Sequence, residues 1–286
     1  MPLRRIVVLV MVCTLVAAVA GCEMSEEREV ALGRDNASQV DARMPIVRDP
    51  AVSEYMQSLG AGIARSTSRA DLDWRFSVVD SRDVNAFALP GGFIYVNRGL
   101  IERAGELDEL AGAIAHEVGH VVRRHSVKQI EKQSGANTVI GATCSLTSLC
   151  NSDLSRVAIQ IGGAALFARY SRHDEAEADS EAVLNVVRAG YDPDGIPRLF
   201  ERLLAERRRS PLRIEGFFAS HPMEEARIEA TRREIASIDR GTAGRLVRDD
   251  EAYRAFRARL AALPRAPDRA VREPELAPRR APPESP

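Results

Sequence analysis

The stretch His116-Glu-Val-Gly-His120 decides the fold, and it lies inside an apolar run that spans residues 109–122. Apolar residues on nearly every side of this run predict a buried helix. In a helix His116 and His120 lie on one face a single turn apart, so both imidazoles reach the same metal ion. Glu117 lies about 100° further around the helix. The pattern therefore indicates a zinc site at which Glu117 is the general base for a metal-bound water that attacks a carbonyl.

A chance occurrence of this pattern is the alternative. In a chain with five histidines we expect such a match on the order of once in a hundred sequences. A buried helix that carried His, Glu and His without partners would be costly, and a bound metal removes that cost. We therefore favour a zinc site.

The first 21 residues have the pattern of a bacterial lipoprotein signal peptide. Two arginines precede an apolar core, residues 6–20, that is shorter than a membrane-spanning helix requires. Small residues then lead to Cys22 and resemble a lipobox, so we expect cleavage before Cys22 and lipidation of its thiol. An ordinary secretory signal with an incidental cysteine is the alternative. Glu23 follows in place of an aspartate, which in a Gram-negative cell favours an anchor at the periplasmic face of the outer membrane.

Charge and composition indicate one globular domain. The chain has 40 basic and 41 acidic residues in 286, a net charge of −1, so nothing suggests binding to nucleic acid. Residues 22–262 are enough for one domain with a substantial core. Residues 263–286 contain seven prolines with arginine and glutamate, and we expect a disordered tail there.

Two cysteines, Cys144 and Cys150, remain after the signal peptide and Cys22. An oxidising compartment favours a disulfide between them, and two buried free thiols are the alternative. The apolar stretches on either side, residues 137–149 and 154–167, are each too short to span a bilayer. We expect buried helices there, with partial membrane contact as the alternative.

Strand-like patterns occur in residues 74–80, 85–89 and 93–96, with a Pro-Gly-Gly turn before the last of them. Helical patterns occupy much of the rest. We expect helices near residues 26–32, 38–42, 50–60, 100–104, 106–125, 176–188, 196–207 and 224–238. The fold class is therefore α+β, mostly helical with a small antiparallel sheet.

A catalytic zinc needs a third protein ligand and one open position. His125 is one candidate, but the known continuation of the motif would need glycine at position 123 and histidine at 126, where this chain has Arg123 and Ser126. The alternative is a carboxylate from residues 170–179. There Glu175 and Asp179 share a helix face, so Glu175 can bind zinc while Asp179 accepts the N–H of a ligand histidine. An acidic, solvated helix start would explain the same residues.

Four stretches carry a family resemblance: residues 85–96, residues 109–125, residues 170–179, and Ser220-His-Pro222 with Arg227. In this ordered set the chain resembles the HtpX/BepA/LoiP group of gluzincin metallopeptidases, and most closely the compact LoiP type of outer-membrane lipoprotein protease. The resemblance implies a zincin-like metallopeptidase domain and one Zn²⁺ per chain. It assigns the zinc ligands to His116, His120 and Glu175, the base to Glu117, and the orientation of a ligand histidine to Asp179.

The resemblance also implies how substrates bind. An edge strand of Phe93, Ile94, Tyr95 and Val96 would hold an extended peptide, with an ordinary hairpin as the alternative. His221 would lie near the zinc, either as a fourth ligand that keeps the enzyme latent or as an oxyanion stabiliser; a loop histidine that caps a helix is the local alternative.

The implied function is zinc-dependent endopeptidase activity on misfolded or misassembled envelope proteins. A non-catalytic envelope chaperone with a retained metal site is the alternative. Glu117 argues against that alternative, because a structural site does not require this carboxylate.

Overall fold

The computed structural model describes residues 23–132, 170–209, 214–222, 225–238 and 246–266 of the chain. The predicted signal peptide, the lipidation site Cys22 and the predicted disulfide between Cys144 and Cys150 lie outside these residues, as does the predicted tail after residue 266. Among the helices in the described ranges, none is both long and apolar enough to cross a membrane.

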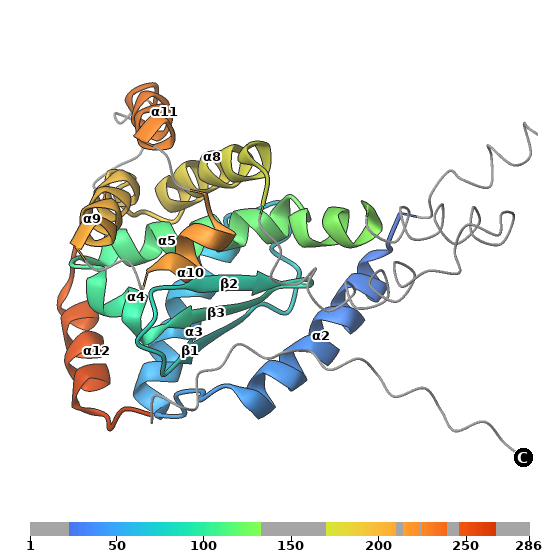
Figure 1. The fold of residues 1–286 in the computed structure, drawn as a ribbon, viewed down its shortest axis with the longest axis horizontal. Helices are drawn as coiled ribbons and strands as arrows, with labels where there is room; N and C mark the ends of the chain where they lie inside the picture. The colour runs from blue at the N-terminus through green and yellow to red at the C-terminus, as the bar shows by residue number, and fades with distance from the viewer. Residues whose placement is uncertain (1–22, 133–169, 210–213, 223–224, 239–245, 267–286) are drawn as a thin grey trace, which may run out of the picture.

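Helices surround one small sheet (Figure 1). Its strands are β1 (Arg75–Val79), β2 (Ala86–Leu89) and β3 (Phe93–Asn97). The labelled helices are α2 (Glu26–Arg43), α3 (Pro50–Ala64), α4 (Arg98–Arg103), α5 (Leu107–Val122), α8 (Arg172–Arg188), α9 (Gly195–Arg209), α10 (Glu215–Ser220), α11 (Glu225–Ala236) and α12 (Glu251–Ala262). Residues 125–132 are also helical. The predicted mostly helical α+β architecture is confirmed.

The strand order in the sheet is β1-β3-β2. β2 and β3 form the expected antiparallel hairpin, but β1 pairs with β3 in parallel, so the sheet is mixed rather than antiparallel. The hairpin turn requires positive φ at Gly91 (75°) and Gly92 (96°), which glycine adopts without strain. β3 inserts between the other strands because Ile94 and Val96 on one face and Tyr95 on the other are all buried.

The predicted substrate edge strand is therefore wrong. Phe93, Ile94, Tyr95 and Val96 belong to the central strand, whose backbone groups pair with a strand on each side. A strand paired on both sides has no free ladder to offer to a peptide. Among the described strands, residues 86–89 of β2 pair only with β3 and form an edge strand of the sheet.

The motif helix α5 is buried along almost its whole length and packs most extensively against α8. Gly119 permits their close approach, since a Cβ there would lie 2.9 Å from the carbonyl oxygen of Ala178. α8 begins after Ser171, which forms a capping box with Asp174. The cap uses the Asp174 carboxylate at the helix start, and Glu175 and Asp179 are left on the face toward α5.

The N-terminal helix α2 runs as one helix where the sequence predicted two, and Gly33 lies inside it. A Cβ at Gly33 would lie 1.9 Å from the carbonyl oxygen of Pro90, so the glycine lets the helix pass directly over the hairpin turn. Nearby, the buried carboxylate of Glu29 accepts hydrogen bonds from Arg69 Nη1 (2.7 Å), Arg124 Nε (2.8 Å) and the Gly91 N–H (3.2 Å). This carboxylate fastens α2 to the hairpin turn and to the end of α5.

We predict that Glu29→Gln lowers the free energy of unfolding by about 3 kcal/mol, because it removes the buried counter-charge that Arg69 and Arg124 share. Urea unfolding followed by circular dichroism measures the loss. Glu26→Gln is the matched control, because Glu26 also pairs with Arg69 but its side chain is 52% exposed; it should cost less than about 1 kcal/mol. Equal losses in the two variants would contradict a special role for Glu29.

Candidate metal centre

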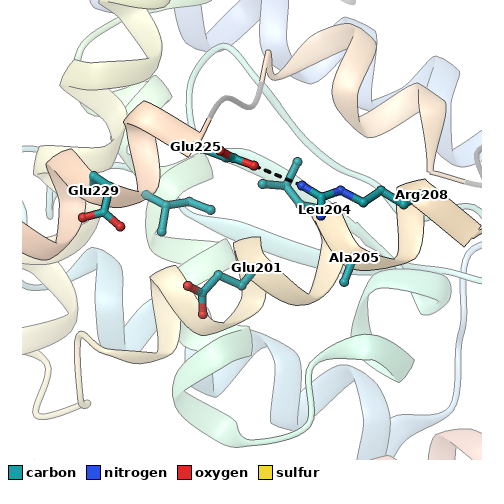
Figure 2. A pocket seen from close by; sticks show the side chains of 7 residues that line it. Glu201, Leu204, Ala205, Arg208, Glu225 and Glu229 are labelled. Carbon is teal, nitrogen blue, oxygen red and sulfur yellow. Dashed lines mark hydrogen bonds and ion pairs between the residues drawn. The ribbon is translucent and has the colours of Figure 1, made fainter.

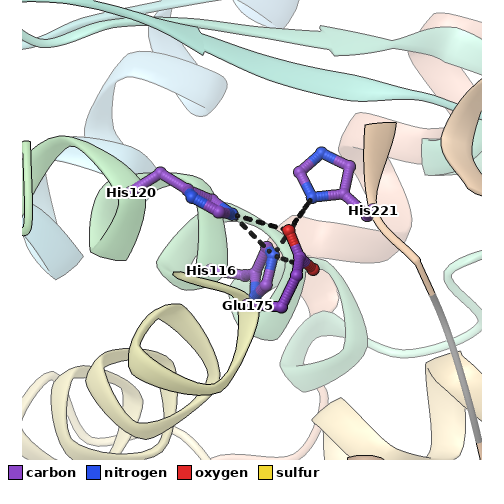
Figure 3. Close-up of side chains that lie close together, drawn as sticks. All are labelled: His116, His120, Glu175 and His221. Atoms are coloured by element: carbon purple, nitrogen blue, oxygen red, sulfur yellow. Dashed lines mark hydrogen bonds and ion pairs between the residues drawn. The ribbon is translucent and has the colours of Figure 1, made fainter. Parts of the chain in front are cut away.

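Three helices bring four ligand-type side chains together in the interior (Figure 3). α5 supplies His116 and His120, α8 supplies Glu175, and His221 follows the last residue of α10. All four are buried. The Nε2 atoms of His116 and His120 lie 3.1 Å apart, as expected for histidines one helical turn apart that aim at one point.

The spacing of these atoms fits a zinc ion. A tetrahedral zinc with ligand atoms at about 2.0–2.1 Å holds those atoms about 3.3 Å apart. Oε2 of Glu175 lies 3.5 Å from His116 Nε2, and Oε1 of Glu175 lies 3.4 Å from His120 Nε2. Nδ1 of His221 lies 3.3 Å from His116 Nε2 and 3.1 Å from Glu175 Oε1. These separations, from 3.1 to 3.5 Å, are close to those between the ligand atoms of a tetrahedral zinc site.

The charges of the cluster also favour a divalent cation. Three buried carboxylates, those of Glu117, Glu175 and Asp179, face a single arginine, Arg227. Arg227 offsets part of this negative charge, and the remainder lies in a region of low dielectric constant, where unpaired charge is costly. Oε2 of Glu117 has no hydrogen-bond partner within the described part of the chain. A divalent ion beside it supplies the missing charge.

The pKa values of the site follow from burial and from these contacts. Burial disfavours a charged imidazole at both motif histidines and lowers the pKa of His120 well below its ordinary value. At His116 the contacts with Asp179 and Glu175 outweigh burial and raise the pKa to about 10. Burial raises the pKa of Glu117. For Glu175, the surrounding imidazoles outweigh burial and lower the pKa.

Asp179 lies where the sequence predicted a partner for a ligand histidine. Its Oδ1 is 2.9 Å from Nδ1 of His116. Arg227 donates from Nε and Nη2 to the two Asp179 oxygens, both at 2.8 Å, and from Nη1 to the Pro222 carbonyl at 2.9 Å. Its Nη1 also lies 2.6 Å from Glu175 Oε2. The Arg227 guanidinium thus joins both α8 carboxylates to the His221 loop.

Tyr170 and His125 hold the ring of His120 in place. The sequence did not identify Tyr170 as a site residue. Tyr170 stacks on His120 with ring centroids 3.9 Å apart and an interplanar angle of 19°. Its hydroxyl lies 2.9 Å from Oγ of Ser126. His125, which the sequence offered as a candidate third ligand, is buried, and its Nδ1 lies 2.9 Å from Nδ1 of His120. The sequence feature that could have identified Tyr170 is its position directly before Ser171, the N-cap of α8.

A separate surface hollow lies between α9 and α11 (Figure 2). Glu201, Glu225 and Glu229 line it together with Arg208, which donates to Glu225 at 3.0 Å. It contains none of the groups of the candidate metal centre. We therefore assign the chemistry to the buried histidine and glutamate cluster.

Comparison with known proteins identifies relatives of this chain. It is 28% identical to the beta-barrel assembly-enhancing protease of Escherichia coli K12 over 74% of this chain and 45% of that protein. It is 27% identical to the metalloprotease LoiP of the same organism over 73% of this chain and 81% of LoiP, and 33% identical to its metalloprotease YcaL over 57% and 62%. The chain thus spans about half the length of the beta-barrel assembly-enhancing proteases that it matches.

Residues 50–235 match peptidase family M48. The matched range includes every residue of the candidate metal centre. Peptidases of this family use zinc, so the zinc and the zincin-like domain predicted from the sequence are confirmed. The match over most of the described domain shows that this chain belongs to peptidase family M48.

Proposed function

We propose that this chain is a zinc metalloendopeptidase whose metal is held by His116, His120 and Glu175. The convergence of these three buried side chains, from two helices, on one point carries the proposal. Zinc in such a site supplies an activated water and polarises a scissile carbonyl. The LoiP and YcaL relatives are named metalloproteases, which supports the same activity.

Glu117 is the general base in this proposal. It follows the ligand His116 on α5 and is buried, with its Oε1 3.4 Å from Nε2 of His221. Burial raises its pKa, which strengthens the carboxylate as a proton acceptor. Glu117 accepts the proton of the attacking water and passes it to the leaving amine.

His221 is the fourth group around the metal position, and we assign it to a latent state. Its Nδ1 lies among the ligand atoms of His116 and Glu175, in the position that a catalytic site keeps open. Its Nε2 faces Glu117. A histidine in this position blocks both the water site and the base, and its loop has to move before a substrate can bind.

Substrate binds along β2 in the corrected assignment. Residues 86–89 occupy an edge of the sheet, and β2 packs against α5. An extended peptide that adds to this edge would lie beside the motif helix with its backbone hydrogen-bonded to the strand. A binding site that reads the backbone suits unfolded segments of varied sequence.

The natural substrates in this proposal are misfolded or misassembled envelope proteins. The beta-barrel assembly-enhancing proteases among the relatives support this class of substrate. We place the domain, residues 22–262, at the periplasmic face of the outer membrane, anchored by a lipid on Cys22 after removal of residues 1–21. The first described helix begins at Glu26, so the anchor would keep the domain close to the bilayer surface.

Glu117→Gln should abolish proteolysis and retain zinc. The amide cannot accept the water proton, so cleavage of unfolded casein should fall by a factor of about 100 or more. Zinc content by atomic absorption checks that the site is intact. Undiminished cleavage would reject Glu117 as the base, and zinc binding without cleavage of any unfolded protein by the wild type would favour the chaperone alternative.

His221→Ala should increase casein cleavage, because it opens the fourth position and frees Glu117. Initial rates at saturating zinc measure the effect, and zinc content should stay near one per chain because three ligands remain. A fall in cleavage with zinc retained would instead identify His221 as an oxyanion stabiliser.

Zinc affinity should weaken as the pH falls. The metal-free His116 holds a proton with its pKa raised to about 10, and zinc displaces that proton. Below pH 10 the apparent affinity should therefore fall by about tenfold for each pH unit. Competition with a chromogenic chelator between pH 6.5 and 8.5 measures it. A flat profile would show that His116 is unprotonated in the metal-free protein.

A further inference from the structure

The two motif histidines have different partners at the ring nitrogens that face away from the metal position. His116 Nδ1 lies 2.9 Å from the Asp179 carboxylate, whereas His120 Nδ1 lies 2.9 Å from Nδ1 of His125. A zinc-binding histidine usually donates its second N–H to a carboxylate, a backbone carbonyl or water. His125 is therefore a different kind of acceptor for His120. Its imidazole is neutral, and its Nδ1 can accept only in the tautomer that carries the proton on Nε2.

The contacts around His125 select that tautomer. His120 directs Nε2 at the metal position, so its proton is on Nδ1 and this nitrogen is the donor. His125 Nδ1 must then accept and cannot itself carry a proton. The proton of His125 is on Nε2, which lies 3.2 Å from Oε2 of Glu177. The chain of donors thus runs in one direction, from His120 to His125 to Glu177.

The backbone after α5 holds His125 in this position. Arg124 adopts a φ of +57°, in the left-handed region that is unfavourable for a residue with a side chain. Its side chain donates from Nε to the buried Glu29 at 2.8 Å, which helps to hold the turn. The turn at residues 123–124 leads directly into a further helical stretch that begins at His125, and His125 is buried beside the ring of His120.

Other contacts complete the support of His120. Tyr170 covers one face of the ring, while His125 meets its edge at Nδ1. Glu177 has a side chain that is only 25% exposed, and its Oε1 lies 3.7 Å from Nη1 of Arg123. Glu177, the last acceptor in the hydrogen-bonded series from His120 through His125, is therefore itself held near the surface by Arg123.

We propose that His125 is a positioning residue for the zinc ligand His120, with Glu177 selecting its tautomer. The proposal rests on the zinc site proposed above. His125 holds the His120 ring in the orientation that aims Nε2 at the metal. Because its acceptor is neutral, His120 stays a weaker electron donor than His116, whose partner is the anionic Asp179. The unequal pair leaves the zinc more electrophilic than two carboxylate-supported histidines would.

Zinc affinity of the full chain, measured by chelator competition at pH 7.5, tests the proposal. His125→Ala should weaken zinc binding by about 10- to 100-fold. His125→Asn should restore most of the affinity, because its Oδ1 can accept from His120 Nδ1 near the position of the lost nitrogen. His173→Ala is the matched control: this histidine also lies near Glu177, at 3.8 Å, but its side chain is 82% exposed, and its loss should leave the affinity unchanged.

A merely structural role predicts a different pattern. In that case His125→Ala and His125→Asn would both lower the melting temperature of the metal-free protein and leave zinc affinity equal to that of the wild type, which would overturn the proposal. The visible absorption of the cobalt-substituted protein is a second readout, which should shift in His125→Ala and not in His173→Ala.

Glu177→Ala keeps the test usable if His125→Ala does not fold, because Glu177 is partly exposed and its loss creates no buried cavity. We expect zinc binding to weaken several-fold in this variant, and unchanged affinity would contradict the role of Glu177. If the wild type itself binds no zinc, the proposed function fails. If the wild type binds zinc and the variants match it, only the positioning role fails.

Discussion

The close contact between α5 and α8 is the constraint on which the rest of the structure depends. Gly119 lets the two helices meet almost backbone to backbone, and this contact encloses imidazoles and carboxylates away from water. Such a group of buried charges is unstable unless its excess negative charge is neutralised. Arg227 neutralises part of that excess, and zinc neutralises the remainder. Packing and metal binding are therefore linked in this domain, because the same buried groups take part in both.

The surrounding elements hold this contact in place from several directions. The sheet and α3 pack beside α5, and α2 fastens the hairpin turn to the end of α5 through the Glu29 carboxylate. At the other end of α5, the hydroxyl of Tyr253 in α12 donates to the Ala104 carbonyl at 2.7 Å. The motif helix is thus held at both ends by elements from opposite ends of the chain, which keeps the ligand histidines in a fixed register.

The one group around the metal position that comes from a short helix is His221. α10 has six residues, and the loop after it contacts the site through the Pro222 carbonyl and Arg227. His116, His120 and Glu175 come from helices of 16 and 17 residues. An element with so little of its own secondary structure can change position at lower cost than the long helices. This difference makes His221 the natural candidate for a movable fourth ligand.

The sequence by itself determined the local features. His116, Glu117 and His120 occupy one helix, and the 3.6-residue period alone places them around one point. The same holds for the turn at Gly91 and Gly92, whose glycines accept positive φ. These features depend on a few neighbouring residues, so a pattern in the sequence is enough to predict them.

Only the tertiary structure decided the rest. From the residues alone, any of several carboxylates in α8 was a possible third ligand. Packing turned Glu175 inward and left Asp174 at the helix cap. β3 became the central strand because both of its faces are buried, and the sequence pattern did not reveal its neighbours. His125 became the partner of His120 only after the turn at Arg124, held by Glu29 from a distant helix. Each of these outcomes depends on contacts between residues far apart in the chain, which the period of a single helix or strand does not encode.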